Sequence, residues 1–168
     1  IAFTGTDSAS LTYTYNGTPV AKSITRTPFA AQPKACSWSA FDRSFSDDYQ
    51  DLWWNPNESG WGVNIAHQAD TLFATLFTYD RNGKGLWLVM SDGVNTGFGR
   101  YSGSLYRTSG PPFSASPWRS VTQTPVGTMS FTFSDGDTGS MTYTVDATTV
   151  TKPIQRFTFQ AMRPDCGS

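Results

Sequence analysis

The sequence predicts an all-β fold, and three features of the chain predict it. Aromatic residues make up 15% of the 168 residues and Thr, Ser and Gly are abundant, whereas Glu occurs only once. This composition favours strands over helices. Apolar and polar residues alternate between turn signals, and the first 36 residues recur at the end of the chain, displaced by 130 positions. We expect an antiparallel up-and-down β-barrel of about 8–10 strands, with a two-sheet β-sandwich as the alternative.

The internal repeat aligns residues 1–36 with residues 131–166 and keeps fourteen identities. The identical pairs are Phe3/Phe133, Asp7/Asp137, Ser10/Ser140, Thr12/Thr142, Tyr13/Tyr143, Thr14/Thr144, Thr18/Thr148, Val20/Val150, Lys22/Lys152, Ile24/Ile154, Arg26/Arg156, Phe29/Phe159, Ala31/Ala161 and Cys36/Cys166. Such a pattern is typical of one full repeat joined to the tail of another. We expect one β domain over residues 1–168, and residues 1–36 either complete it or belong to a preceding repeat.

The predicted strands follow one another as hairpins. Residues 10–15 and 18–27 flank Asn16-Gly17, a strong hairpin signal, and the repeat places a second hairpin around Asp146-Ala147. The other predicted strands are 60–67, 71–79, 86–91, 98–106, 126–133, 139–145 and 148–159. Residues 37–59 and the Pro/Ser-rich residues 109–125 show no periodicity, so we expect them to be irregular.

Both copies of the hairpin are expected to carry cations on the same face as core aliphatics. A two-residue turn sets Leu11 opposite Lys22, and alternate residues on each strand share that face. The cations on it are Lys22, Arg26, Lys152 and Arg156. A buried cation needs a carboxylate or carbonyl partner, and the candidates are Asp47, Asp48, Asp51 and Glu58. Alternatively, these cations line a barrel mouth that binds a ligand, or extend to the rim.

Charge and cysteine usage narrow the cellular context. The net charge is −1 with 15% charged residues and no Lys/Arg run, so nucleic acid is not an expected partner. No stretch of about 20 apolar residues predicts a membrane span, and no signal peptide is seen, as expected for the mature form of an exported chain. Cys36 and Cys166 occupy equivalent repeat positions, which favours a disulfide over two reduced, buried thiols. The oligomeric state is open, although an exposed hairpin in residues 1–29 would be an unprotected edge.

The densest motif lies in residues 51–68, where three tryptophans, the only Glu and the only His fall close together. Aromatic rings beside amide and carboxylate groups are typical of a surface that binds sugars. The predicted ligand-binding residues are Trp53, Trp54, Asn55, Glu58, Trp61, Asn64, Trp87 and Trp118. The alternative is a core role, in which Trp61 and one of Trp53 and Trp54 are buried, because adjacent strand residues point to opposite sides.

Several motifs resemble an uncharacterised β-domain family of secreted bacterial proteins. They are WWNPNESGWG, TLFATLFTYD, GLWLVM, SLYRTSGPPF, VGTMSFTF and MTYTV followed by TKPIQR. The resemblance covers residues 37–160, with the tail motif again in residues 11–29. It implies a secreted, extracellular or periplasmic bacterial domain and no established activity. Gly60-Trp61-Gly62 also looks like the first strand of lipocalin- and avidin-type barrels.

The sequence contains few residues that are suited to catalysis or to metal binding. Glu58 with a nearby Asp could serve a glycoside hydrolase, whereas His67 lacks a nucleophile elbow and is expected to be structural. One His and two cysteines are too few for a transition-metal site, and the Asp-rich turns at 80–83 and 134–137 match no calcium-binding loop, so we expect no metal or cofactor. The favoured function is a non-catalytic module that binds a polysaccharide or other extracellular polymer. The alternatives are a structural repeat, in which residues 1–29 pair with the barrel, and a small glycoside hydrolase.

Overall fold

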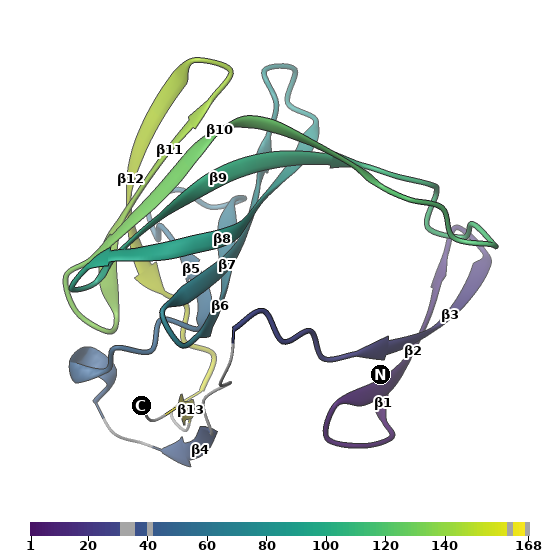
Figure 1. Cartoon of the computed structure of the whole chain (residues 1–168), viewed down its shortest axis with the longest axis horizontal. Helices are drawn as coiled ribbons and strands as arrows, with labels where there is room; N and C mark the ends of the chain where they lie inside the picture. Colours follow the sequence, from purple (N-terminus) through teal and green to yellow (C-terminus); the bar gives the residue numbers. More distant parts are fainter. Residues whose placement is uncertain (31–35, 40–41, 161–162, 167–168) are drawn as a thin grey trace. The chain divides into compact units, whose positions relative to one another are not determined.

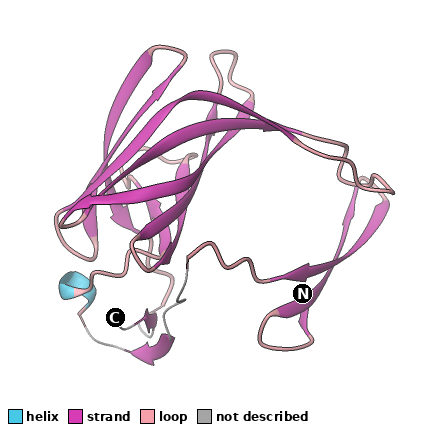
Figure 2. Cartoon of the chain, viewed as in Figure 1, coloured by secondary structure: helices cyan, strands magenta, loops and turns pink. Residues whose placement is uncertain are grey.

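In the computed structural model, the regular secondary structure of the described residues is almost entirely β-strand (Figure 2). It describes the backbone of residues 1–30, 36–39, 42–160 and 163–166, without the side chains of residues 36, 38, 39 and 163–166. The chain divides into two compact units, one formed by residues 1–29 with 109–122 and the other by residues 30–108 with 123–168. The one helix in the described part is the single 3-10 turn Arg43–Phe45.

Eight antiparallel strands form a closed barrel in the larger unit (Figure 1). They are β5 (Asp51–Trp54), β6 (Gly62–Gln68), β7 (Thr71–Tyr79), β8 (Gly85–Gly97), β9 (Arg100–Ser109), β10 (Thr122–Phe133), β11 (Thr138–Val145) and β12 (Thr148–Arg156). Each strand pairs with the next along the chain, and β12 pairs back with β5 through Gln155–Trp54 and Arg156–Trp53. The up-and-down barrel is therefore confirmed and the sandwich alternative is excluded.

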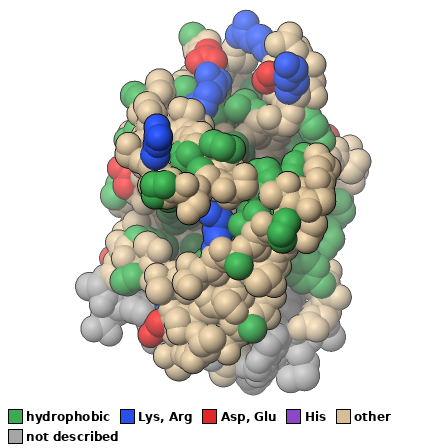
Figure 3. Space-filling model, turned by 90° about the vertical axis from the view of Figure 1, so that its right-hand side faces the viewer, with side chains coloured by type: hydrophobic (Ala, Val, Ile, Leu, Met, Phe, Trp, Pro, Cys, Tyr) green, Lys and Arg blue, Asp and Glu red, His purple; other side chains and the backbone are tan. Residues whose placement is uncertain are grey.

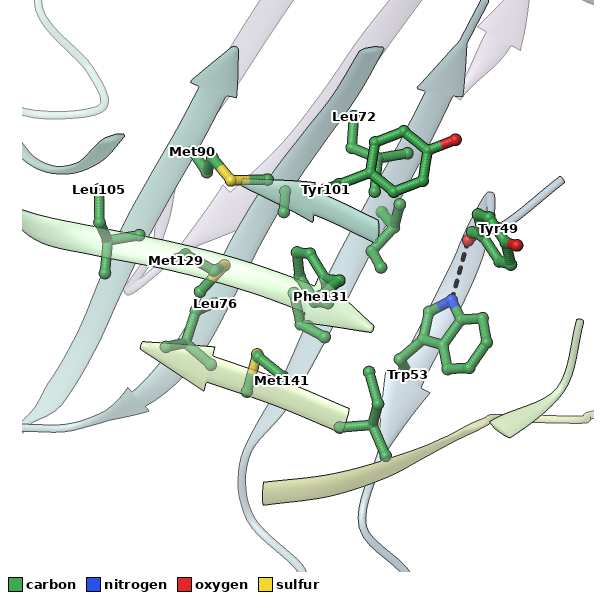
Figure 4. Packing of buried hydrophobic residues seen from close by; sticks show 14 of the residues in the cluster. Tyr49, Trp53, Leu72, Leu76, Met90, Tyr101, Leu105, Met129, Phe131 and Met141 are labelled. Atoms are coloured by element: carbon green, nitrogen blue, oxygen red, sulfur yellow. Dashed lines mark hydrogen bonds between the residues drawn. The ribbon is translucent and has the colours of Figure 1, made fainter. Parts of the chain in front are cut away.

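Side chains from alternate strand positions fill the barrel interior (Figure 4). Leu72 and Leu76 from β7, Met90 from β8 and Met141 from β11 are completely buried. Trp53 is also buried, and its indole Nε1 donates to the Tyr49 carbonyl at 2.9 Å. The centre of the barrel is thus a packed core, as in other small barrels, and binding surfaces must lie at its ends or on its outside.

Both predicted hairpin turns have the same backbone conformation, which glycine adopts freely at its second central position and alanine adopts with strain. Asn16 and Gly17 have φ values of 47° and 77°, and Asp146 and Ala147 have φ values of 48° and 67°. Positive φ at both central residues defines the type I′ turn that matches the twist of a two-residue hairpin. The register follows, since Leu11 lies opposite Lys22 as predicted.

The smaller unit holds a sheet of its own. It contains β1 (Ala2–Phe3), β2 (Ser8–Tyr15) and β3 (Thr18–Thr25). Residues 109–122 pack on this hairpin: the Phe113 ring lies 5.3 Å from the Tyr15 ring, and Lys22 Nζ lies 4.6 Å above the Trp118 ring. Within the described residues, β1–β3 form a three-stranded sheet of their own, separate from the barrel sheet. The structural-repeat hypothesis stays a prediction.

Arg156 shows how the barrel accommodates a buried cation. Its guanidinium donates to the carbonyls of Asp48 at 2.8 Å and Gln50 at 2.9 Å, and Nη1 lies 3.3 Å from the Asp51 carboxylate. The group also sits 4.8 Å from the centre of the Trp53 ring. Of the predicted partners, Asp51 meets Arg156 through its carboxylate, whereas Asp48 does so through its backbone carbonyl.

A short two-stranded sheet brings the two cysteines opposite each other. It consists of β4 (Cys36–Ser39) and β13 (Arg163–Cys166), and its register pairs Cys36 with Cys166. The side chains of both residues lie outside the described part of the structure, so the disulfide stays a prediction. Within the described residues, no helix is long and apolar enough to cross a lipid bilayer.

Candidate functional site

An aromatic groove lies on the outer face of the barrel, over β5, β6 and β7. It has a volume of about 320 Å³. Its lining residues include Leu52, Trp54, Trp61, Gly62, Asn64, Phe77, Phe157 and Phe159. Among the described residues that line it, none is charged, and Asn64 is the one with a side-chain amide. We refer to this surface as the aromatic groove.

The strand register produces the groove. Trp53 pairs with Val63, which sets Trp54 beside Gly62 on the outside, and Gly62 in turn pairs with Phe77. Because Gly62 has no side chain, a gap is left between the Trp54 and Phe77 rings. A Cβ atom on Gly62 would lie 3.3 Å from the Trp53 carbonyl oxygen, so the backbone here is closely approached as well.

The row of outward-facing rings continues beyond the groove. Phe77 pairs with Trp87 on β8, and the two side chains are 48% and 53% exposed. On the other side, the Trp54 ring packs edge-on against Phe157 at 5.0 Å, and Phe157 lies 5.0 Å from Phe159. An exposed apolar surface of this kind is typical of an interaction site.

Trp61 and Glu58 are held in a fixed arrangement beside the groove. The Trp61 indole Nε1 donates to Glu58 Oε2 at 3.1 Å, and Lys152 forms an ion pair with the same oxygen. Lys152 Nζ also lies 5.4 Å from the centre of the Trp61 ring. The hydrogen bond from Lys152, with a smaller contribution from Trp61, holds the pKa of Glu58 below its usual value. Glu58 is therefore one of the predicted partners for a cation on the hairpin face.

Some of the predicted ligand-binding residues lie elsewhere. Trp53 belongs to the core with 1% exposure, because its pairing with Arg156 directs it inward. Asn55 is also buried, and its side-chain oxygen accepts the Asn57 N–H at 3.0 Å to form a turn. Trp118 belongs to the smaller unit, where it contacts Lys22. The predicted residues that form the groove are the half-buried Trp54 and Trp61 and the exposed Asn64, and those that flank it are Glu58 and Trp87.

The sequence prediction missed Phe77, Leu52 and the two phenylalanines that follow β12. For Phe77 the signal was present: along β7, Leu72, Ala74 and Leu76 are buried, so the odd-numbered positions face outward. Strict alternation in TLFATLFTY thus identifies Phe77 as a surface aromatic residue. Phe157 and Phe159 fall within the strand predicted at 148–159, but β12 ends at Arg156, so alternation does not place them.

A second cavity opens at the barrel end formed by the β7–β8 and β11–β12 turns. It has a volume of about 370 Å³ and combines apolar walls, including Leu88 and Tyr143, with a polar rim. On that rim, Arg107 Nη2 lies 3.4 Å from the Asp146 carboxylate and Arg81 donates to Thr148 Oγ1 at 3.2 Å. These contacts hold the guanidinium groups against the hairpin turn.

A buried Asp–His–Tyr array lies beside another cavity, of about 260 Å³. His67 Nδ1 accepts the Tyr49 N–H at 3.3 Å and lies 3.5 Å from Asp48, while Nε2 lies 3.2 Å from the Tyr101 hydroxyl. Burial raises the pKa of Tyr101 to about 12. A hydroxyl that keeps its proton is a poor nucleophile, so the array supports the expected structural role of His67.

The Asp-rich turns use their oxygens internally. Asp80 Oδ1 accepts the N–H groups of Asn82 at 2.8 Å and Lys84 at 2.9 Å, and Asp135 Oδ1 accepts those of Asp137 at 2.8 Å and Thr138 at 2.7 Å. Among the described residues, no three His, Cys, Asp or Glu side chains are grouped so as to hold a metal ion.

Comparisons with protein-family models, with curated proteins and with solved structures find no match to this chain.

Proposed function

We propose that this chain is a secreted or periplasmic bacterial module that binds a neutral polysaccharide, or another uncharged extracellular polymer, in the aromatic groove. The observation that carries the proposal is the arrangement of Trp54 and Phe77 on either side of Gly62, continued by the exposed Trp87. Flat apolar rings stack on the apolar faces of sugar rings, and the Asn64 amide supplies a hydrogen-bonding group beside them.

Charge and exposure support a neutral, extended ligand. The described residues that line the groove are all uncharged. On the face displayed in Figure 3, the Lys and Arg side chains are mixed with acidic and uncharged ones. A row of rings that extends over four neighbouring strands, from β5 to β8, suits a chain of sugars better than a single small molecule. A polymer that contacts several rings gains affinity from each of them.

A hydrolase that uses Glu58 as its general acid is less well supported. Such an acid needs a raised pKa so that it stays protonated near neutral pH. The hydrogen bond from Lys152 lowers the pKa of Glu58 instead, and the Trp61 indole holds the same oxygen. The arrangement favours a structural role for Glu58 in positioning Trp61 beside the groove.

The experiment is a binding assay of the full chain against a panel of insoluble polysaccharides, followed by titration with soluble fragments of any polymer that retains it. Phe77→Ala and Trp87→Ala remove one exposed ring each. By comparison with other stacking platforms, each loss should cost about 1–3 kcal/mol, which is roughly 5-fold to 150-fold in Kd.

Phe45→Ala is the matched control, since Phe45 is 93% exposed on the short helical turn and does not line the groove. Retention that Phe45→Ala leaves unchanged and both groove variants weaken supports the proposal. A chain that is retained by no polymer, or groove variants that bind as well as Phe45→Ala, would refute it.

A further inference from the structure

The hairpin in residues 1–29 copies the pairing of the last three barrel strands, residue for residue. Leu11 pairs with Lys22 as Met141 pairs with Lys152, at a displacement of 130 positions. The short first strand joins the copy as well: β1 pairs with β2 in the register that the end of β10 keeps with β11. Thus β1–β3 reproduces a three-stranded piece of a barrel wall.

The base of the hairpin is copied in the same detail. The Arg26 N–H donates to the Asp7 carbonyl at 2.9 Å, and the Arg156 N–H donates to the Asp137 carbonyl at 2.9 Å. The side chains repeat this pairing, with Nε to Oδ1 distances of 3.0 Å in the first copy and 3.2 Å in the second. The conformation of β1–β3 therefore already fits a barrel.

The two copies differ in what covers the inward face. Ile154 is 3% exposed and Phe133 is 5% exposed, whereas their counterparts Ile24 and Phe3 are 37% and 81% exposed. The Arg26 side chain is 62% exposed, although Arg156 is buried. In the first copy, the end of the inward face that carries Phe3, Ile24 and Arg26 is therefore exposed to solvent.

In the second copy, the equivalent surface is covered by another segment of the barrel. Residues 48–53 cover it in the second copy, where Arg156 donates to the Asp48 and Gln50 carbonyls and lies over the Trp53 ring. In the first copy a cavity of about 190 Å³ remains, lined by residues that include Phe3, Ala9, Ile24 and Arg26. The other end of the face is covered by Phe113 and Trp118 of the loop.

We propose that β2–β3 is a donor hairpin that closes the barrel of a second copy of this chain, in the place of that copy's β11–β12, while β1 leaves the edge of β2 that the acceptor's β10 then pairs with. Arg26 then takes the position of Arg156 against residues 48–53 of the acceptor, and Ile24 enters its core. The loop residues Phe113 and Trp118 leave the hairpin as it inserts. Exchange of identical elements between copies is an established route to assembly.

One difference between the copies explains why each barrel is closed by its own hairpin. Gly136 lies where the first copy has Thr6, and a Cβ atom on Gly136 would lie 1.7 Å from the Arg43 carbonyl oxygen. A donor with Thr6 must displace the turn that contains Arg43, so the resident hairpin is preferred. The donor is used when the resident hairpin is weakened or displaced.

The first test weakens the resident hairpin in the full chain. Ile154→Asp places a carboxylate in the core, and the expected result is a shift from the mass of one copy to two or more in light scattering. Adding Thr6→Gly should increase the assembled fraction, and adding Ile24→Asp to Ile154→Asp should abolish it. An Ile154→Asp chain that stays a folded monomer overturns the proposal, and so does assembly that Ile24→Asp leaves unchanged.

The second test does not depend on a destabilised barrel. Gln155 pairs with Trp54, so its counterpart Thr25 should lie beside Trp54 of an acceptor. A chain with Thr25→Cys and Trp54→Cys is refolded from denaturant at increasing concentration and oxidised, and its cross-links are mapped by peptide mass spectrometry.

A link between the two introduced cysteines of different copies, increasing with concentration, supports the exchange. The control combines Thr25→Cys with Thr75→Cys, because Thr75 lies on β7 and pairs with β6 and β8. Inter-copy links no more frequent than in this control, at every concentration, overturn the proposal.

Discussion

Arg156 and its repeat counterpart Arg26 allow the stability contribution of a buried guanidinium to be measured against an internal control. Arg156→Met removes the charge and keeps most of the side-chain volume. It leaves the carbonyls of Asp48 and Gln50 without these donors and removes one of the two guanidinium groups that lie 3.3 Å from the Asp51 carboxylate, the other being that of Arg43. Each of these groups is in the interior or only partly exposed, so water replaces the lost contacts poorly.

The expected loss follows from these contacts. Each buried acceptor left without a donor costs about 1–3 kcal/mol, and removing one partner of a buried ion pair costs about 3–5 kcal/mol in total. We expect Arg156→Met to lower the free energy of unfolding of the barrel by about 3–5 kcal/mol. Arg26→Met breaks an ion pair with Asp7 in which both side chains are more than half exposed, so its effect should stay below about 1 kcal/mol.

The assay is urea unfolding followed by tryptophan emission, in which the buried Trp53 reports on the barrel. The midpoint should fall strongly for Arg156→Met and little for Arg26→Met, with similar slopes for both chains. Equal midpoint shifts in the two variants would show that the burial of Arg156 has no special role in stability.

Three further predictions concern single residues. Ala147→Gly should raise the free energy of unfolding by about 1 kcal/mol in thermal or urea unfolding, because Ala147 has a φ of 67°, which glycine adopts without strain. Glu58→Gln should reduce the free energy of unfolding at neutral pH but not in acid. The pKa of Glu58 is lowered in the folded chain, so its carboxylate contributes stability above the pKa of the unfolded chain, and this contribution is lost as the pH falls through the folded pKa. Comparison of urea midpoints of the two chains from pH 7 to pH 3 tests this. Tyr101→Phe should abolish the phase of an ultraviolet phenolate titration that occurs at the highest pH, because the pKa of Tyr101 is raised to about 12. The ionisation of Tyr101 should lower the free energy of unfolding of the natural chain between about pH 10 and 12, and this loss should be absent from Tyr101→Phe.

Local signals predicted the hairpins because the relevant interactions are local. Asn16-Gly17 and Asp146-Ala147 both form the expected turn, and a two-residue turn leaves only one register for the strands beside it. Alternation then assigned the faces, so Lys152 and Arg156 could be expected on the core side. The number of hairpins and the scarcity of helix-forming segments favoured a barrel over a sandwich, whereas closure is shown by the pairing of β12 with β5.

Some features of the fold depend on contacts between residues that are far apart in the sequence, and local patterns did not predict them. Alternation puts Trp53 and Trp54 on opposite sides of β5, but the pairing of Trp53 with Arg156 is what directs Trp53 inward. The strand predicted at 86–91 extends over Gly85–Gly97, and its pairing with β9 shifts register between Val89 and Val94, an irregularity that no local pattern signals. Carbonyl partners of Arg156 are equally invisible, since any residue supplies a carbonyl.

The repeated hairpin separates these two levels of organisation within one chain. Its two copies share turn conformation, register and the ion pair at the base, although only one of them is part of a barrel. Those features therefore depend on the hairpin sequence alone. Burial does not: Ile24 and Ile154 are identical in type and pairing but differ from 37% to 3% in exposure. The hairpin can thus form before the barrel closes, and closure is the step that removes its inner face from water and gives Arg156 its partners.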